Sequence, residues 1–228
     1  VVSHRIIDES NDPGPIFPGD IQGFEDCRPI WFRGRPWLTA TTRNRNAHML
    51  NEIALLELDD DWKVQGVHIQ HSYEATEPQK NWMPFVRDDS IQFLYKMDPL
   101  TILKVDESTK QALPISISSP PMALFLFRGG SQLLKVDRGW MAVTHEVADS
   151  GKGSRIYLHR FVLLDEHLSL LAITEPFYFF RSGVEFCAGL AYDPEGNRFV
   201  VSFGVNDSEG WLGFLDESAV YDQLRYRV

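Results

Sequence analysis

The sequence has few cysteines and no long apolar runs. Two cysteines, Cys27 and Cys187, occur in 228 residues, which is too few for a disulfide framework. Because free cysteine is mostly a core residue, we expect two buried thiols in a reducing compartment, and hence a cytoplasmic protein. No apolar stretch approaches the roughly 18–20 residues that cross a bilayer, so the sequence predicts no membrane segment.

Positive charge is also scarce. Lysine and arginine number 22 against 32 aspartate and glutamate residues, which gives a formal net charge of −10. Nucleic acids and anionic membrane surfaces are bound through cationic contacts, so both are disfavoured as partners. The hydrophobic fraction of 43% and the charged fraction of 24% are ordinary for a globular chain, and they predict a sizeable core.

Helix signals are few, and the best of them lies in residues 218–228, where Ser218 is the expected N-cap. The chain contains 6 Trp, 7 Tyr and 15 Phe residues, which are spread along it beside Gly-, Pro- and Asp-containing turns. Aromatic residues between such turns are typical of many short strands. The composition therefore predicts an all-β fold.

Four segments repeat one layout of short strands joined by tight turns, and their turns recur at intervals of roughly 50 to 57 residues. That period is expected when a four-stranded sheet forms one blade of a β-propeller. A generic antiparallel sandwich is the alternative, because it is also built from short strands and turns. The blades cover about residues 23–62, 80–110, 124–166 and 183–216, with turns at 33–35, 88–89, 137–139 and 194–197.

Residues 1–22 are too irregular to form a blade of their own. The sequence thus predicts a single propeller domain over residues 1–228 that either closes with four blades or lacks a first blade. We favour the second arrangement, because an open sheet edge exposes unpaired backbone groups. A longer chain with further domains, or a partner copy in a homo-oligomer, would supply the missing blade.

Each repeat carries polar residues at an equivalent end, where the inner strands of a propeller meet in a central funnel. Charges on inner strands must be paired or bound to a ligand, so a salt network and a polar ligand site are both open. Taken together, the set favours a sugar site, since carboxylates and amides bind hydroxyls and aromatic rings stack on sugars. Trp140 lies near the set, whose members are Glu25, Asp26, Arg28, Lys80, Asn81, Trp82, Arg128, Gln132, His145, Glu146, Glu185, Asn206 and Asp207.

Other kinds of chemistry fit the sequence less well. His145 and Glu146 lack a second histidine at helical spacing, and no Cys/His cluster has the spacing of metal ligands. No GxSxG motif is present, and Gly129–Gly130 does not continue as a phosphate-binding loop. The sequence therefore predicts neither a metal nor an organic cofactor.

Three segments together resemble the five-bladed β-propeller enzymes around glycoside hydrolase family 130, the mannoside phosphorylases. They are GFEDCRP at residues 23–29, EPQKNWMPF at 77–85 and EFCAGLAYDPEGNRFVVSFGVND at 185–207. The resemblance covers nearly the whole chain and implies a five-bladed propeller with four blades visible. RGGSQ and HEV are closer to related propeller domains of glycosyltransferases.

The resemblance also implies roles for individual residues. Asp26, in the Glu-Asp-x-Arg element, would be the general acid, and Arg28 would contact the sugar or phosphate. Lys80 and Asn81 would line the sugar subsite, and His145 would hold an anion. Inorganic phosphate would be the co-substrate and would attack the anomeric carbon with inversion.

Several functions remain open at this point. The favoured function is inverting phosphorolysis or glycosyl transfer on a manno-oligosaccharide. The non-enzymatic alternative is a carbohydrate-binding domain of a larger glycosyltransferase. Hydrolysis is a third alternative, because two carboxylates can activate water when they lie roughly 6.5–9.5 Å apart. Glu185 and Asp207 are the candidate partners of Asp26 for that reaction.

Overall fold

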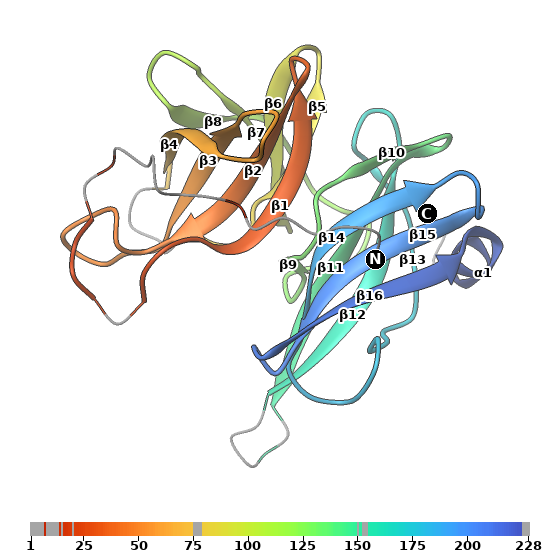
Figure 1. The fold of residues 1–228 in the computed structure, drawn as a ribbon. Coiled ribbons are helices and arrows are strands. Elements are labelled where there is room, and N and C mark those ends of the chain that lie inside the picture. The colour runs from red at the N-terminus through yellow and green to blue at the C-terminus, as the bar shows by residue number, and fades with distance from the viewer. Residues whose placement is uncertain are drawn as a thin grey trace. The chain divides into compact units, whose positions relative to one another are not determined.

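The computed structural model describes residues 7, 14, 16–19, 21–74, 79–149, 151 and 155–224. It divides the chain into two compact units (Figure 1). Unit 1 comprises Val1–Phe93 and Ile102–Ile115, and unit 2 comprises Leu94–Thr101 and Ser116–Val228. Glu77 and Pro78 of the EPQKNWMPF segment, most of the loop at 150–154 and the last four residues lie outside the described residues.

The first sheet of unit 1 is an antiparallel meander of four strands in chain order. The strands are β1 (Glu25–Phe32), β2 (Arg35–Thr42), β3 (Glu52–Leu58) and β4 (Val64–Ser72). Alternate residues on one face form an apolar core that includes Leu38, Ala40, Ala54, Leu56 and Val64. The meander is therefore a blade with a hydrophobic face, as period-two alternation predicts.

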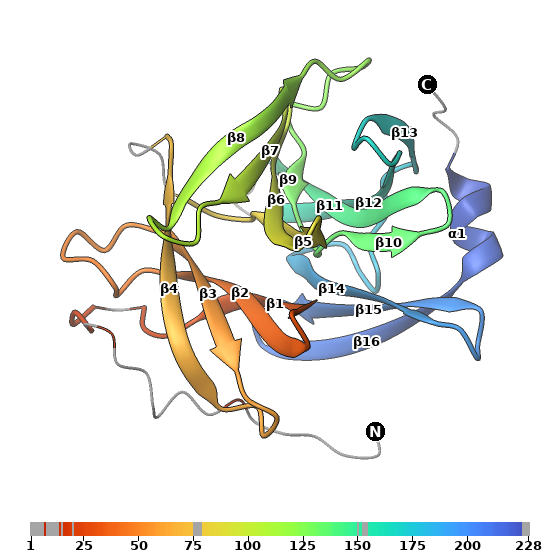
Figure 2. The same cartoon turned by 90° about the horizontal axis from the view of Figure 1, so that it is seen from above.

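The next four strands continue the same sheet in the order β8–β7–β6–β5, as Figure 2 shows from above. They are β5 (Met83–Arg87), β6 (Ser90–Met97), β7 (Leu100–Val105) and β8 (Gln111–Ser118). A short parallel pairing of β4 with β8, at His71–Gln111 and Ser72–Ala112, joins them to the first meander. The eight-stranded sheet is thus two four-stranded blades connected at their outer strands.

Unit 2 contains a five-stranded sheet whose core is the long hairpin of β11 (Gly139–Asp149) and β12 (Arg155–Leu164). The short strands β9 (Arg128–Gly129) and β10 (Leu134–Val136) pair with β11, and β13 (Leu170–Ile173) pairs with β12. β9 and β10 pair with different parts of β11, and residues 130–133 connect them.

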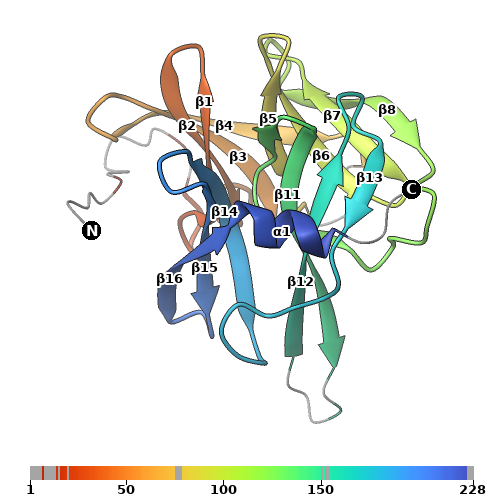
Figure 3. The same cartoon turned by 90° about the vertical axis from the view of Figure 1, so that its right-hand side faces the viewer.

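A second sheet of unit 2 is the antiparallel meander of β14 (Glu185–Asp193), β15 (Arg198–Val205) and β16 (Glu209–Asp216). The helix α1 (Glu217–Gln223) follows β16 directly and in Figure 3 lies crosswise, from the end of β16 toward β12. Val220 of α1 joins a core of buried side chains from both sheets of the unit. The helix thus covers part of the core of unit 2.

The structure confirms the all-β prediction and the four predicted hairpin turns. Arg33 and Gly34 have φ values of 49° and 75°, and Asp88 and Asp89 have values of 52° and 48°. Two successive positive φ values are typical of the type I′ turn, which matches the twist of the strands on either side. β4, β8 and β13 were not predicted; they are the fourth strands of three blades, and β4 and β8 are interrupted by glycine or proline.

Two smaller expectations were wrong. The N-cap of α1 is Asp216, and Ser218 lies inside the helix, because β16 runs straight into the first turn. Cys187 is a buried free thiol as expected, whereas Cys27 is only half-buried. None of the described residues forms a helix with the length and hydrophobicity that a bilayer crossing requires.

Candidate functional site

The first strand of unit 1 begins with a β-bulge that includes Asp26. Glu25 pairs with Thr41 and Arg28 with Thr39, so two residues of β1 lie opposite one residue of β2. Asp26 has a φ of 55°, a left-handed conformation that is uncommon for residues other than glycine. β-Bulges recur next to active sites, where they direct a side chain away from the regular sheet.

A buried arginine supports the bulge from within unit 1. The Arg28 side chain is 1% exposed, and its Nη1 donates a hydrogen bond of 2.7 Å to the carbonyl oxygen of Asp26. A bond from a charged donor to a carbonyl is stronger than one between neutral groups. Arg28 therefore fixes the backbone conformation that presents Asp26.

The segment before β5 brings further polar side chains to the same bulge. Lys80 Nζ lies 3.5 Å from Oε2 of Glu25, and both side chains are partly exposed. Asn81, the next residue, has a φ of 62°, and β5 contacts β1. Unit 1 thus gathers five predicted site residues around one bulge, which we call the bulge site: Glu25, Asp26, Arg28, Lys80 and Asn81.

The prediction that Trp82 stacks on a sugar is corrected by its burial. Its side chain is 1% exposed, packs edge-on against Phe93 with ring centroids 5.1 Å apart, and donates from Nε1 to Gln79. A ring buried in this way has no free face for a ligand. Trp140 is similarly buried, beneath the Lys135 ammonium.

Two predicted site residues of unit 2 use their polar atoms on the backbone. Both oxygens of the fully buried Glu185 accept hydrogen bonds of 2.7–3.0 Å from the N–H groups of residues 179–181. The Gln132 amide exchanges two hydrogen bonds with Leu190. These contacts correct the expectation that Glu185 and Gln132 bind a sugar, because Glu185 is fully buried and both side chains hold backbone groups of unit 2.

His145 lies inside unit 2 rather than on a polar surface. It is buried, stacks on Tyr157 with ring centroids 5.3 Å apart and meets Phe186 edge-on. An anion ligand needs a ring nitrogen that solvent can reach, so this position gives no support to the expected anion contact. On the same strand, Glu146 forms an ion pair with Arg160 at 2.5 Å.

The remaining predicted residues of unit 2 lie on its surface. Arg128 is exposed and pairs with His145 in the β9–β11 ladder. Asn206 and Asp207 form the turn between β15 and β16, with φ values of 52° and 51°. Asparagine and aspartate tolerate that conformation better than most residues, so the turn alone accounts for their identity.

Two residues near the bulge site were not predicted from the sequence. Thr39 and Thr41 pair with Arg28 and Glu25, and their hydroxyl oxygens are buried without a hydrogen-bond partner among the described residues. Buried polar atoms without partners are rare in proteins. The alternating threonines of WLTATT were the available signal.

The described part of the chain contains no group of three or more His, Cys, Asp or Glu side chains arranged to hold a metal ion. The chemistry available at the bulge site is that of carboxylates, one buried guanidinium and one exposed ammonium. Such a set suits a ligand that carries hydroxyl or anionic groups.

Comparison with known proteins gives structural matches only. No protein-family model and no curated protein matches the chain. A structure described as a member of the family 130 mannoside phosphorylases, from work on glycoside hydrolases that target β-1,2-mannosidic linkages in Candida mannan, matches with a TM-score of 0.65. That match has 15% identity and covers 93% of this chain and 70% of the other.

A family 43 glycoside hydrolase from Bacillus licheniformis matches with a TM-score of 0.53 and 15% identity, covering 92% of this chain and 45% of the other. A mannose phosphorylase from Leishmania mexicana, solved with a phosphate ion, reaches a TM-score of 0.44 at 12% identity, covering 93% of this chain and 88% of the other. The first two matches show that the chain has a β-propeller fold like that of glycoside hydrolase family 130.

Proposed function

We propose that this protein is a carbohydrate-active enzyme that cleaves a mannoside by inverting phosphorolysis, with Asp26 of the bulge site as the general acid. The observation that carries the proposal is the conformation of Asp26. A buried arginine holds this carboxylic acid at a positive φ within a bulge, beside the Lys80–Glu25 ion pair. Aspartate tolerates this conformation, so the bulge and the bond from buried Arg28, rather than backbone strain, distinguish the position.

In the proposed reaction, Asp26 gives its proton to the glycosidic oxygen as the bond from that oxygen to the anomeric carbon breaks. An oxygen of inorganic phosphate attacks the anomeric carbon from the opposite face and forms the new bond. The products are a sugar 1-phosphate of inverted configuration and the shortened saccharide. Asp26 is left as a carboxylate and regains its proton from solvent.

The neighbours of Asp26 have separate roles in this proposal. Arg28 is a positioning residue, because its buried side chain is bonded to the Asp26 backbone. Lys80 is partly exposed and supplies a positive charge that can attract phosphate. Glu25 holds the Lys80 ammonium and accepts hydroxyl hydrogen bonds.

The fold supports the substrate class without fixing the reaction. The family 130 match comes from work on enzymes for β-1,2-mannosidic linkages, so β-1,2-mannobiose is the first substrate to test. Phosphorolysis with inversion turns this β-linkage into α-mannose 1-phosphate. Water in place of phosphate would give free mannose, the outcome expected of a hydrolase.

The test incubates the protein with β-1,2-mannobiose and inorganic phosphate and detects sugar phosphate by mass spectrometry. We expect Asp26→Asn to slow product formation by about 10²–10⁴-fold, the usual contribution of general acid catalysis. Asparagine tolerates a positive φ, so the bulge is retained. The matched control is Asp60→Asn, which changes an exposed aspartate in the β3–β4 turn.

The outcomes separate the candidate functions. Sugar phosphate from the wild type and not from Asp26→Asn supports phosphorolysis, whereas mannose without sugar phosphate indicates hydrolysis. Mannobiose binding that is equal in both forms, with no product from either, indicates a carbohydrate-binding domain and contradicts the proposal.

A further inference from the structure

Unit 1 contains a pocket of about 300 Å³ that has no part in the bulge site. Its lining includes Phe32, Trp37, His68, Gln70, Glu107 and Lys110. Phe32 ends β1, six residues after Asp26, and a strand rises about 3.3 Å per residue. The pocket and the bulge site therefore lie roughly 20 Å apart along β1.

One wall of the pocket is apolar and is set by strand pairing. Trp37 pairs with Glu57 and Leu55 with His68, so these four side chains share one face of the first meander. The rings of Trp37 and His68 stack with centroids 5.9 Å apart. Burial, reinforced by the Lys110 charge and opposed by Glu57, lowers the pKa of His68 below its ordinary 6.5.

A buried glutamine on the same face has an unused acceptor. Gln70 is 1% exposed, and its Nε2 donates to the His68 carbonyl at 2.7 Å, which identifies the other atom as Oε1. Among the described residues no donor bonds to that Oε1. Leaving a buried acceptor unpaired costs about 1–3 kcal/mol. A ligand with a hydroxyl or N–H group would remove that cost.

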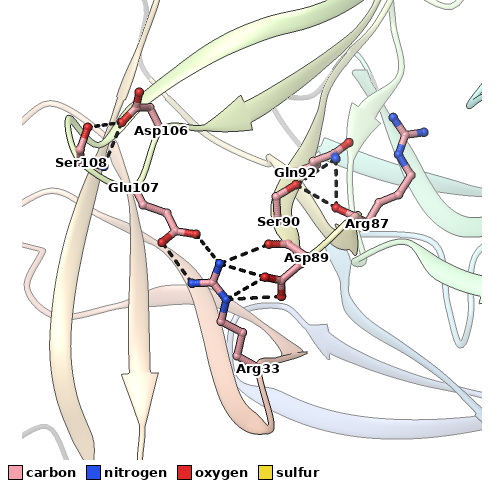
Figure 4. A network of polar contacts seen from close by, with 8 residues as sticks. All are labelled: Arg33, Arg87, Asp89, Ser90, Gln92, Asp106, Glu107 and Ser108. Carbon is pink, nitrogen blue, oxygen red and sulfur yellow. Dashed lines mark hydrogen bonds and ion pairs between the residues drawn. The ribbon is translucent and has the colours of Figure 1, made fainter.

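The cations around the pocket are paired, with one exception. Figure 4 shows Arg33, in the β1–β2 turn, bonded to Asp89 of the β5–β6 turn and to Glu107 after β7. Arg35 pairs with Glu57 at 2.9 Å. Lys110 has no ion pair within the part of the chain that the structure describes.

The residues that carry the unused acceptor and the unpaired cation come from neighbouring parts of the backbone. β4 and β8 run parallel, with His71 paired to Gln111, and the His71 N–H donates to the Lys110 carbonyl. Gln70 in β4 and Lys110, the residue before β8, therefore occupy neighbouring backbone positions. Both side chains line the pocket beside the apolar wall.

We infer that this pocket binds a small 2-hydroxy acid with an apolar body. The carboxylate would pair with Lys110, the adjacent hydroxyl would donate to Gln70 Oε1, and the apolar part would lie against Phe32 and Trp37. The volume is at the lower end of the range for small-molecule sites, which suits a ligand with one ring.

The test uses mandelate and two probes that each lack one of its groups. Phenylacetate lacks the hydroxyl, and 1-phenylethanol has a methyl group in place of the carboxylate. Binding is followed by NMR through the indole N–H signal of Trp37, which Trp37→Phe identifies. We expect mandelate to bind tightest. Gln70→Leu should weaken mandelate by about 5-fold and leave phenylacetate unchanged, as the loss of one hydrogen bond predicts.

Lys110→Met should weaken both acids by about 3-fold or more and leave 1-phenylethanol unchanged. This variant also keeps the test decisive if Gln70→Leu fails to fold, because the Lys110 side chain has no ion pair to lose. The inference is overturned if mandelate at millimolar concentration leaves the Trp37 signal in place. It is also overturned if Gln70→Leu weakens mandelate and phenylacetate equally and Lys110→Met weakens mandelate and 1-phenylethanol equally. Neither result depends on activity at the bulge site.

Discussion

Gln132 and Leu190 exchange two hydrogen bonds although they are 58 residues apart in the sequence. The Gln132 Nε2 donates to the Leu190 carbonyl at 2.9 Å, and the Leu190 N–H donates to Oε1 at 3.2 Å. The side chain thereby acts as a short piece of β-ladder against β14. It connects the segment between β9 and β10 to the second sheet of unit 2.

Replacing Gln132 with alanine should destabilise unit 2. Both groups of Leu190 lose their partners, and Leu190 is buried, so we expect the free energy of unfolding to fall by about 1–3 kcal/mol. Chemical denaturation measures the loss, and faster hydrogen exchange at the Leu190 amide locates it. Gln65→Ala is the control because it removes an exposed amide contact in unit 1; an equal effect of both variants would contradict this role.

The carboxylate of Glu185 organises the loop at residues 179–181. Glu185→Gln keeps the shape of the side chain but replaces one charged acceptor oxygen with an NH₂ donor that faces backbone N–H groups. We expect a loss of about 1–3 kcal/mol in the free energy of unfolding. Hydrogen exchange of the three amides should accelerate together. Glu195→Gln, in the exposed β14–β15 turn, should leave stability and exchange unchanged.

His159 should make the stability of the protein depend on pH below neutrality. Burial lowers the pKa of His159 from its ordinary 6.5 to about 4. Between these values the unfolded chain binds a proton that the folded chain does not, so stability is full above pH 6.5 and falls as the pH drops toward 4. The difference corresponds to about 3 kcal/mol.

The measurement compares unfolding free energies of the wild type and His159→Leu from pH 7 to pH 4. The variant should lack the part of the decline that comes from this histidine, so the unfolding free energy of the wild type minus that of the variant should fall by about 3 kcal/mol from pH 7 to pH 4. His167→Gln, at an exposed turn, is the matched control. Parallel curves for the wild type and His159→Leu would contradict the assignment.

Phe199 should be among the most sensitive core positions of unit 2. It is fully buried and contacts the rings of Phe161, Tyr192 and Tyr221, the last of which belongs to α1. Phe199→Ala leaves a cavity, and we expect a loss of about 3–5 kcal/mol by denaturation. Phe125→Ala removes a ring that is 72% exposed and should change stability by less than about 0.5 kcal/mol; a similar loss from both would rule out a core role for Phe199.

The sequence was most informative where local geometry decides the structure. The turns at Arg33–Gly34 and Asp88–Asp89 could be predicted because their residue types tolerate positive φ values. The roles of Glu185 and Gln132 could not, because each depends on a backbone partner that folding brings close. A carboxylate that binds backbone N–H groups and one that binds a sugar have the same appearance in a sequence.

The same difference between local patterns and long-range contacts applies to the candidate site. The Glu-Asp-x-Arg element indicated Asp26 and Arg28, and the structure adds that Asp26 lies in a bulge whose backbone accepts a hydrogen bond from Arg28. The pocket around Gln70 was not predicted, because its lining comes from six strands and two turns. No local sequence pattern reveals how these strands pair. Trp82 was misassigned because aromatic rings that pack a core and rings that bind sugars share one residue type.

The bulge in β1 has a consequence for how this strand tolerates changes in length. An extra residue reverses the phase of side-chain alternation, so residues before Asp26 and residues after Arg28 follow opposite odd–even rules. Deleting Cys27 would remove the bulge and leave a regular ladder, with Glu25 still opposite Thr41 and Arg28 still opposite Thr39. Deleting one residue elsewhere in the strand would instead turn the residues on one side of the deletion onto the other face of the sheet. Along this strand, then, chain length is as strongly constrained as residue type.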